Sequence, residues 1–247
     1  MSTPTRILLV GAAGRMGQAI QHAADGNDAF EIVGRLERGE AVCSSLNDCD
    51  GVIDFSHADA TSDVCAAAIR AKKPLVIGTT GHTFAQLAAI KSAAEKIPVL
   101  LAANFSVGVN TLFWLTRKAA ELLGPEVDLE VVETHHRLKK DAPSGTAKRL
   151  AEILCEARQL SYEKDVAHGR QGMIGERPDT QIGMHSIRAG DVVGEHTVIL
   201  AGKGERLELT HKAASRETFA AGALRAAQWL VGKPAGLYDM EDVLHLK

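Results

Sequence analysis

The sequence predicts an α/β protein of two domains, the first built on a parallel sheet and the second an α+β domain with a mixed sheet. In the first part of the chain, short apolar runs alternate with helical patterns, as in βαβ units. After Phe105 this alternation ends, and three strand-like runs later follow one another without helices between them. A length of 247 residues suits one large domain or two modest ones, and the change of pattern favours two.

The parallel sheet is predicted from apolar runs that are typical of buried strands. The first run, Arg6 to Val10, leads into a segment whose apolar residues recur at helical spacing from Met16 to Ala23. The expected strands are residues 6–10, 31–36, 51–55, 75–77 and 99–102. The expected helices between them are residues 15–24, 59–71 and 84–96.

The second part of the chain has a different order of elements. A helix over 111–123 precedes a long strand over 128–134 and a second helix over 145–157. Residues 161–179 are polar and rich in glycine, which predicts a long loop. The remaining elements are expected at 183–189, 193–201 and 206–211 for strands and at 215–231 for a closing helix.

Composition excludes several classes of protein. With 28 Lys and Arg against 31 Asp and Glu, the net charge is −3, so no overall basic field exists to hold a nucleic acid. No run approaches the roughly 18 apolar residues of a membrane helix. The 4 cysteines show no C-x-x-C spacing, which indicates a reducing compartment and neither a disulfide framework nor a zinc site. No export signal is visible at the first residues, so a cytoplasmic enzyme or small-molecule binder is expected.

Three glycines follow the first strand and open the first helix. Gly11, Gly14 and Gly17 form a G-x-x-G-x-x-G pattern, where backbone amides and the helix dipole can bind a pyrophosphate. This spacing departs from the common G-x-G-x-x-G, so the pattern alone is a weak signal. Glu37 stands at the end of the second strand, where a carboxylate can accept hydrogen bonds from ribose hydroxyls. Together these features predict a Rossmann-type dinucleotide-binding domain.

Arg38, directly after this acid, can pair with a ribose 2′-phosphate, so use of both NADH and NADPH is expected. The alternative for Glu37 and Arg38 is a solvated strand end. Two further turns close the fourth and fifth strands, and the carboxyl ends of parallel strands are where such sheets bind ligands. These turns, expected to line the nicotinamide half, are Gly78, Thr79 and Thr80, and Ala102, Ala103, Asn104 and Phe105.

The segment from Glu133 to Ala147 concentrates imidazoles, cations and a helix start. An unperturbed histidine has a pKa of about 6.5, so His135 and His136 can exchange protons near neutral pH. Lys139 offers a second proton donor. The run from Pro143 to Thr146 is typical of a helix N-terminus, whose amides bind carboxylates. The segment therefore suits an anionic, dicarboxylic substrate.

Two alternatives remain open for the paired histidines. One is a polar hairpin that exposes both side chains. The other is a metal site, which is less favoured because adjacent residues of a strand face opposite sides and no His or Cys lies nearby at ligand spacing.

These motifs resemble the dihydrodipicolinate reductase family, and the resemblance extends over essentially the whole chain. The quoted matches are residues 10–17 (VGAAGRMG), 77–81 (IGTTG), 102–110 (AANFSVGVN), 135–147 (HHRLKKDAPSGTA), 188–197 (RAGDVVGEHT) and 211–216 (HKAASR). One departure is a shorter segment between Arg38 and Asp50 than in longer family members, which bears on the preference between NADH and NADPH.

The resemblance implies hydride transfer from NADH or NADPH to an unsaturated heterocyclic dicarboxylate, with loss of water, in lysine and diaminopimelate biosynthesis. It implies catalytic roles for His135 and Lys139 and leaves open which of them delivers the proton. The implied substrate ligands are His136, Ser144, Gly145 and Thr146. The implied nucleotide contacts are Gly11, Ala12, Ala13, Gly14, Arg15, Met16, Glu37, Arg38, Gly78, Thr79, Thr80, Ala102, Ala103, Asn104 and Phe105.

The resemblance also implies a homotetramer built through sheets of the second domain. It places the dinucleotide-binding domain at residues 1–106 and 216–247 and the substrate-binding and oligomerisation domain at 107–215. A non-catalytic NAD(P)H sensor of the same fold is an alternative function. A semialdehyde dehydrogenase is another, but it needs a cysteine nucleophile beside a basic partner, and none is evident in the sequence.

Overall fold

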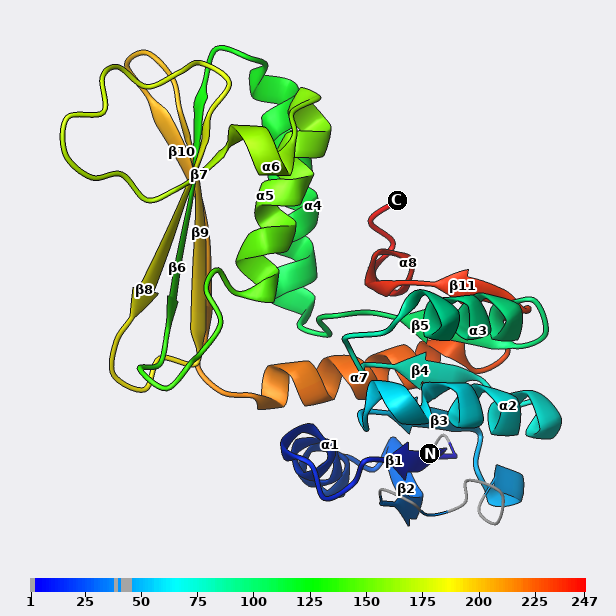
Figure 1. Cartoon of the computed structure of the whole chain (residues 1–247). Coiled ribbons are helices and arrows are strands. Elements are labelled where there is room, and N and C mark those ends of the chain that lie inside the picture. Colours follow the sequence, from blue (N-terminus) through cyan, green and yellow to red (C-terminus); the bar gives the residue numbers. More distant parts are fainter. Residues whose placement is uncertain (1–2, 38–39, 41–45) are drawn as a thin grey trace. The chain divides into compact units, whose positions relative to one another are not determined.

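The chain folds into two compact units. The computed structural model describes residues 3–37, 40 and 46–247. One unit comprises residues 1–107 and 216–247, and the other comprises residues 108–215 (Figure 1). We describe each unit by itself, as unit 1 and unit 2.

Unit 1 is built on a parallel sheet of six strands in the order β11-β5-β4-β3-β1-β2. Five of these strands match the predicted runs, and their bounds are β1 (Thr5–Val10), β2 (Phe30–Leu36), β3 (Gly51–Asp54), β4 (Leu75–Ile77) and β5 (Pro98–Leu101). The sixth, β11 (Gly236–Tyr238), was not predicted; it pairs with β5 and contains only three residues. Its sequence, Gly-Leu-Tyr, lacks the apolar run that marks the equally short β4, Leu-Val-Ile.

The central strands are apolar on both faces because helices cover the sheet on both sides. Leu8 of β1 packs with residues of α2 (Thr61–Ala71) and α3 (Phe84–Ala94). Ile7 and Leu9 point the other way, into the core formed with α1 (Arg15–Asp25), α7 (Glu217–Leu230) and α8 (Met240–Leu244). Two short 3₁₀ helices, Leu46–Asp48 and Ala58–Ala60, complete this unit.

Unit 2 contains a five-stranded mixed sheet in the order β10-β9-β6-β8-β7. The central strand β6 runs parallel to β8 and antiparallel to β9, so the predicted mixed sheet is confirmed. Helices α4, α5 and α6 lie on one face of the sheet, whereas the other face carries no helix of this unit (Figure 1). The bounds are α4 (Val107–Leu123), β6 (Asp128–His135), α5 (Gly145–Arg158), α6 (Tyr162–Asp165), β7 (Val166–His168), β8 (Ile182–Arg188), β9 (Gly194–Ala201) and β10 (Arg206–Ala213).

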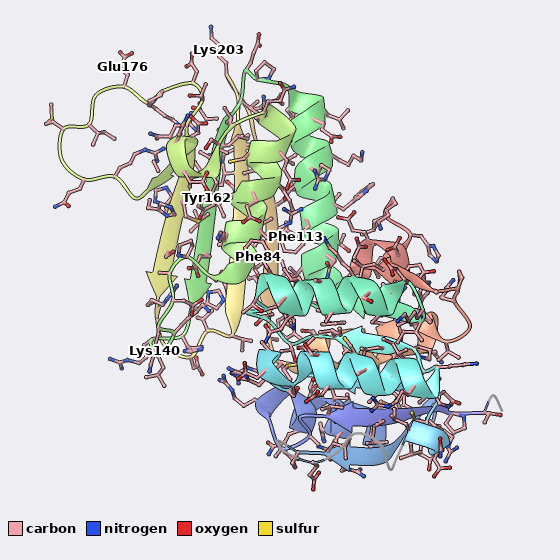
Figure 2. The ribbon with its side chains drawn as sticks, turned by 45° about the vertical axis from the view of Figure 1, so that its right-hand side comes forward. Phe84, Phe113, Lys140, Tyr162, Glu176 and Lys203 are labelled. Carbon is pink, nitrogen blue, oxygen red and sulfur yellow. The ribbon has the colours of Figure 1, made fainter. Side chains whose placement is uncertain are left out.

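The predicted loop over 161–179 is partly wrong. Its first residues form the single-turn helix α6 and the strand β7, which pairs with β8. The pairing stabilises β7 although its own sequence carries no strand pattern. The remaining long loop contains Glu176 and lies at the end of the sheet opposite Lys140 (Figure 2). None of the helices in the described part of the chain meets the length and hydropathy needed to span a membrane.

Candidate active site

The glycine loop between β1 and α1 has the close packing that a dinucleotide site requires. Gly11 has φ of +82°, and a Cβ there would lie 2.6 Å from the carbonyl oxygen of Phe55. A Cβ at Gly17 would lie 2.2 Å from the carbonyl oxygen of Gly11, so this glycine lets α1 approach the turn. Gly14 is the N-cap of α1. The amides that follow it, of Arg15 and Met16, have no intrahelical acceptor and can bind a pyrophosphate.

Two glutamines of α1 hold the carbonyl groups of this loop. Gln21 Nε2 donates to the carbonyl oxygens of Ala12 at 3.0 Å and Gly17 at 3.2 Å, and Gln18 Nε2 donates to that of Ala13 at 3.3 Å. Arg35 Nε in turn donates to Gln21 Oε1 at 2.6 Å. These two glutamines were not among the residues predicted from the sequence. The available signal was their position, three residues apart in the helix that follows the glycine loop.

The acidic partner of the glycine loop lies where it was predicted. Glu37 directly follows β2 and is exposed, and its backbone amide donates to Glu40 Oε2 at 2.8 Å. Arg38, which was predicted to pair with a ribose 2′-phosphate, lies outside the described residues. The residues present therefore fit a nicotinamide dinucleotide: a glycine cradle that a side chain would fill, a helix N-terminus and an exposed carboxylate.

The other two predicted turns lie at the carboxyl ends of β4 and β5. A Cβ at Gly78 would lie 2.2 Å from the ring of Phe55, so only glycine allows this approach. Thr79 is buried and Thr80 is exposed. The Phe105 side chain is 2% exposed and packs against Phe55 with ring centroids 5.3 Å apart. Phe105 is thus a core residue whose side chain is not available for contact with a nucleotide.

In unit 2, the strand β6 carries the predicted catalytic histidine. Its burial alternates along the strand, so Leu129, Val131, Glu133 and His135 share the buried face. The first two belong to the apolar core, whereas Glu133 and His135 bring a carboxylate and an imidazole to the end of that face. The prediction of a polar hairpin with two exposed histidines does not describe His135, whose side chain is 11% exposed.

Glu133 is fully buried and is held by donors from three elements. Arg188 of β8 donates from Nη2 to Oε1 at 2.8 Å and from Nη1 to Oε2 at 2.9 Å. The amide of Ser144 donates to Oε1 at 3.2 Å, and His135 Nδ1 is hydrogen-bonded to Oε2. Burial raises the pKa of Glu133, but the hydrogen bonds with His135, Arg188 and Ser186 outweigh burial and lower it well below its usual range. Glu133 is therefore ionised at neutral pH.

The loop after β6 brings the predicted lysine into an ion pair. Lys139 Nζ donates to both oxygens of Asp141, each at 2.9 Å. This pairing lowers the pKa of Asp141. The carbonyl oxygen of Asp141 also accepts from Arg188 Nη2 at 2.7 Å, so the loop is tied to the Glu133 cluster. His136 follows the end of β6 and is half-buried.

The helix start predicted at 143–146 is confirmed. Ser144 is the N-cap of α5, and its Oγ accepts from the amide of Ala147 at 3.1 Å. Gly145 is exposed at the first turn, and a Cβ there would meet nothing within 4 Å. A hydrogen bond of 3.0 Å also joins Ser144 Oγ to His196 Nε2. Burial, followed by the neighbouring His135, lowers the pKa of His196 to about 4, so this imidazole is neutral.

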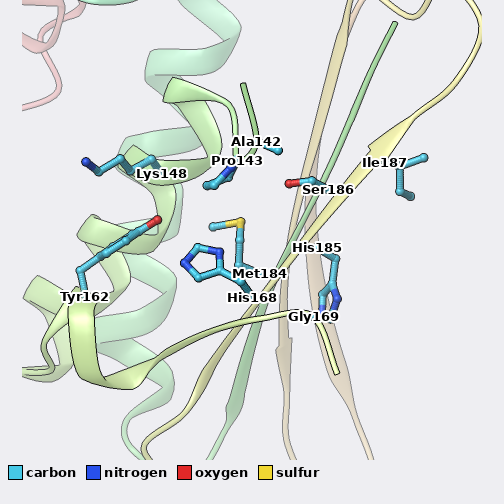
Figure 3. A pocket seen from close by; sticks show the side chains of 10 residues that line it. All are labelled: Ala142, Pro143, Lys148, Tyr162, His168, Gly169, Met184, His185, Ser186 and Ile187. Atoms are coloured by element: carbon cyan, nitrogen blue, oxygen red, sulfur yellow. The ribbon is translucent and has the colours of Figure 1, made fainter. Parts of the chain in front are cut away.

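A cavity of about 790 Å³ borders this cluster on unit 2. Pro143 and Ser186 line it on one side, with Tyr162 and His168 on the other (Figure 3). His135 and Lys139 are not among its lining residues. The cavity therefore adjoins the Glu133–His135 pair through the Pro143 turn and Ser186, but neither His135 nor Lys139 faces it.

The three cysteines that the structure describes do not offer a nucleophile. Cys49, Cys65 and Cys155 are buried and unpaired, and burial raises the pKa of Cys65 and of Cys155 to about 11. Cys43 lies outside the described residues. Among the residues that the structure describes, no group of three His, Cys, Asp or Glu side chains could hold a metal ion.

Comparison with known proteins decides the family. The family profile described as dihydrodipicolinate reductase, N-terminus, matches residues 5–105, and the one described as dihydrodipicolinate reductase, C-terminus, matches residues 108–244. The chain belongs to the dihydrodipicolinate reductase family. The family predicted from the motifs is therefore confirmed, as are the α/β fold class and the assignment to the reductases.

Relatives within this family match nearly the whole chain. The 4-hydroxy-tetrahydrodipicolinate reductase of Akkermansia muciniphila is 58% identical over 240 residues, which cover 97% of this chain and 98% of that protein. The one from Hahella chejuensis is 46% identical over 266 positions, covering 98% of this chain and 100% of that protein. Because 266 positions exceed the 247 residues of this chain, the Hahella protein contains segments that are absent here.

A solved structure shows the same fold. The dipicolinate-bound dihydrodipicolinate reductase from Paenisporosarcina sp. TG-14 superposes with a TM-score of 0.78 at 25% identity, covering 97% of this chain and 99% of that one. These matches favour the catalytic interpretation over the non-catalytic sensor. The prediction of a nicotinamide dinucleotide as cofactor is confirmed at the level of NADH or NADPH.

Proposed function

We propose that this chain reduces 4-hydroxy-tetrahydrodipicolinate to tetrahydrodipicolinate, with loss of water, as a step of diaminopimelate and lysine biosynthesis. The observation that carries this proposal is the buried Glu133–His135 pair, which lies beside the N-terminus of α5 in a member of the dihydrodipicolinate reductase family. Bound NADH or NADPH supplies the hydride. The protein's residues supply the binding site for the dicarboxylate and the proton.

His135 and Lys139 are the proposed catalytic residues. Hydride addition to a conjugated imine builds negative charge, and a nearby cation stabilises that charge and can deliver a proton. Both side chains extend from β6 and the loop that follows it, and Arg188 ties that loop to Glu133. Lys139 must exchange its partner Asp141 for the substrate before it can act, whereas His135 keeps its carboxylate partner throughout.

The N-terminus of α5 is the proposed carboxylate site. Ser144 caps the helix, and Gly145 leaves its first turn without a side chain. The positive end of the helix dipole favours an anion there. Together with His136 and Thr146, these residues form the proposed substrate contacts.

The glycine loop with Glu37 is the proposed site of the adenosine and pyrophosphate. The first amides of α1 bind the phosphates, and the exposed Glu37 carboxylate accepts from the ribose hydroxyls. Arg38, from its place in the sequence beside Glu37, would pair with the 2′-phosphate of NADPH. The backbone of the turns at 78–80 and 102–105 is proposed to contact the nicotinamide half.

The experiment that tests this function follows the absorbance of the reduced nucleotide. The substrate is made freshly from pyruvate and aspartate semialdehyde by the preceding synthase. We expect oxidation of NADH and of NADPH that depends on both the synthase and this protein. Absence of oxidation with either nucleotide would contradict the proposed activity, and the variant Glu37→Ala, expected to weaken nucleotide binding, serves as a control for the assigned site.

We also propose a homotetramer that works in the cytoplasm. The sheet face of unit 2 without helices carries Ile187, which is 46% exposed, and the half-buried Val132 and Ile199, which alternate with the core residues of their strands. Such a face is typical of an interface between subunits. Light scattering after size-exclusion chromatography is expected to give four times the 26.3 kDa of one chain. A monomer at micromolar concentration would rule out this assembly.

A further inference from the structure

The strongest unassigned feature of the molecule is the way in which Glu133 holds His135. Glu133 is 0% exposed in the middle of unit 2, and its two oxygens receive the guanidinium of Arg188, the amide of Ser144 and the ring of His135. A buried carboxylate with this many fixed donors is ionised and can only accept hydrogen bonds. The hydrogen of the bond to His135 must therefore reside on Nδ1 of the imidazole.

The other nitrogen of the ring faces a space kept open by a glycine. A Cβ at Gly194 would lie 3.0 Å from His135 Nε2, which is the nearest atom that such a Cβ would meet. The ring itself packs edge-on against His196, with centroids 5.1 Å apart. The charged and titratable groups around it are Glu133 on β6, Arg188 on β8, His196 on β9, His211 on β10 and Lys139 on the following loop.

We propose that Glu133 is a positioning residue that keeps the hydrogen of neutral His135 on Nδ1 and so makes Nε2 the atom through which this imidazole exchanges a proton. The inference rests on the proposed function, in which His135 takes part in proton transfer. In that step the N–H bond at Nε2 of the imidazolium breaks, its electron pair stays on nitrogen, and the proton passes to the substrate. The neutral ring that remains keeps the Nδ1 hydrogen that Glu133 accepts.

We expect replacement of Glu133 by glutamine to change the tautomer of His135. Arg188 and the amide of Ser144 both donate to Oε1, so the amide oxygen of a glutamine is best placed there. Its NH₂ group then faces His135 Nδ1 as a donor. The ring must accept at Nδ1 and carry its hydrogen on Nε2, which is the wrong tautomer for accepting a proton there.

The test is nitrogen-15 NMR of the full chain labelled at histidine, without substrate. We expect the Nδ1–H tautomer for His135 in the wild type and the Nε2–H tautomer in Glu133→Gln. Turnover of Glu133→Gln is expected to fall about 10²-fold or more, the scale of a misplaced proton-transfer group. The matched control is Glu130→Gln on the same strand, because the Glu130 carboxylate also forms hydrogen bonds with two arginines and a histidine. We expect the turnover of Glu130→Gln to stay within about threefold of the wild type.

Three results would overturn the inference: a wild-type His135 with its hydrogen on Nε2, an unchanged tautomer in Glu133→Gln, or an equal loss of turnover in Glu130→Gln. If Glu133→Gln does not fold, Gly194→Ala is the second test variant. Its methyl group would crowd Nε2 of His135 without touching Glu133. That variant is expected to keep the Nδ1–H tautomer and to lose about tenfold or more in turnover. A wild type that oxidises neither nucleotide refutes the proposed function alone, since the tautomer is still measured.

Discussion

At the scale of single residues, Lys139 is the group whose charge the proposed reaction uses most directly. Its side chain is 19% exposed and forms an ion pair with Asp141 in the loop after β6. We expect Lys139→Ala to lower kcat by about 10²-fold or more, because a positioned acid contributes on this scale. Steady-state kinetics with the synthase-coupled assay measure this loss, and near-normal turnover would remove Lys139 from the mechanism.

Asp141→Asn is the partner control for this prediction. It removes the charge that holds Lys139 while leaving the lysine itself in place. We expect kcat to stay within about threefold of the wild type, since Asp141 is mostly exposed and an exposed ion pair contributes little. A loss as large as that of Lys139→Ala would show that the pair acts as one unit.

The sequence predicts some of these residues and not others, for a physical reason. His135 and Lys139 stand out in a dense local motif, and the alternation along β6 places Glu133 and His135 on one face. Arg188 and His196 could not be assigned from local sequence. They reach the site because β8 pairs His135 with Arg188 and β9 pairs Glu133 with His196, and such register depends on the packing of the whole sheet.

At the scale of elements, the glutamines of α1 fix the shape of the glycine loop. Gln21 bonds the carbonyl of Ala12, and this leaves the loop's amide groups to face a phosphate. We expect Gln21→Leu to weaken binding of NADH by about 3- to 10-fold, because the loop loses a hydrogen bond of roughly 1 kcal/mol. Fluorescence titration of NADH measures the effect. Gln18→Leu, which removes a longer bond to Ala13, is the control and is expected to change binding less.

A cluster of ion pairs around Glu130 holds the long loop after β7. Glu130 on β6 accepts from Arg170 at 2.7 and 3.0 Å, from Arg177 at 3.2 Å and binds His185 at 2.8 Å. Burial raises the pKa of Glu130, but these hydrogen bonds lower it to about 2. Because the folded pKa lies below the ordinary value of 4.5, this stabilisation is present above pH 4.5 and is lost as pH falls toward 2.

The resulting prediction concerns acid unfolding. The free energy of unfolding of the wild type should exceed that of Glu130→Gln at pH 5, and this difference should shrink by about 2 kcal/mol as the pH falls to 2. Urea unfolding at a series of pH values measures both proteins under identical conditions. A difference that does not change with pH would mean that folding does not lower the pKa of Glu130.

The elements themselves were predicted well where a pattern is long and poorly where it is short. The five main strands of the parallel sheet and helices α1, α3 and α5 begin and end within two residues of the expected bounds. Helix α6 and strands β7 and β11 contain four residues or fewer and were missed. The two strands are stabilised by pairing, β7 with β8 and β11 with β5, rather than by their own sequence.

At the scale of the whole molecule, the proposed nucleotide site and the proposed catalytic histidine belong to different units. The glycine loop lies in residues 1–107 and His135 in residues 108–215, and each unit has its own apolar core. The chain passes from one unit to the other at 107–108 and at 215–216. Hydride transfer, as proposed, needs the nicotinamide and the substrate in contact with each other.

We therefore expect compaction when both ligands are bound. The two connections, near 105–110 and 214–216, are the expected hinges because the chain passes from one unit to the other there. Small-angle scattering should show a smaller radius of gyration with NADH and dipicolinate together than with NADH alone, dipicolinate being the ligand bound in the Paenisporosarcina structure. The binding energy of the second ligand favours the closed form, since only that form contacts both molecules. An unchanged radius of gyration with both ligands bound at saturation would mean that the units are already held in the reactive arrangement.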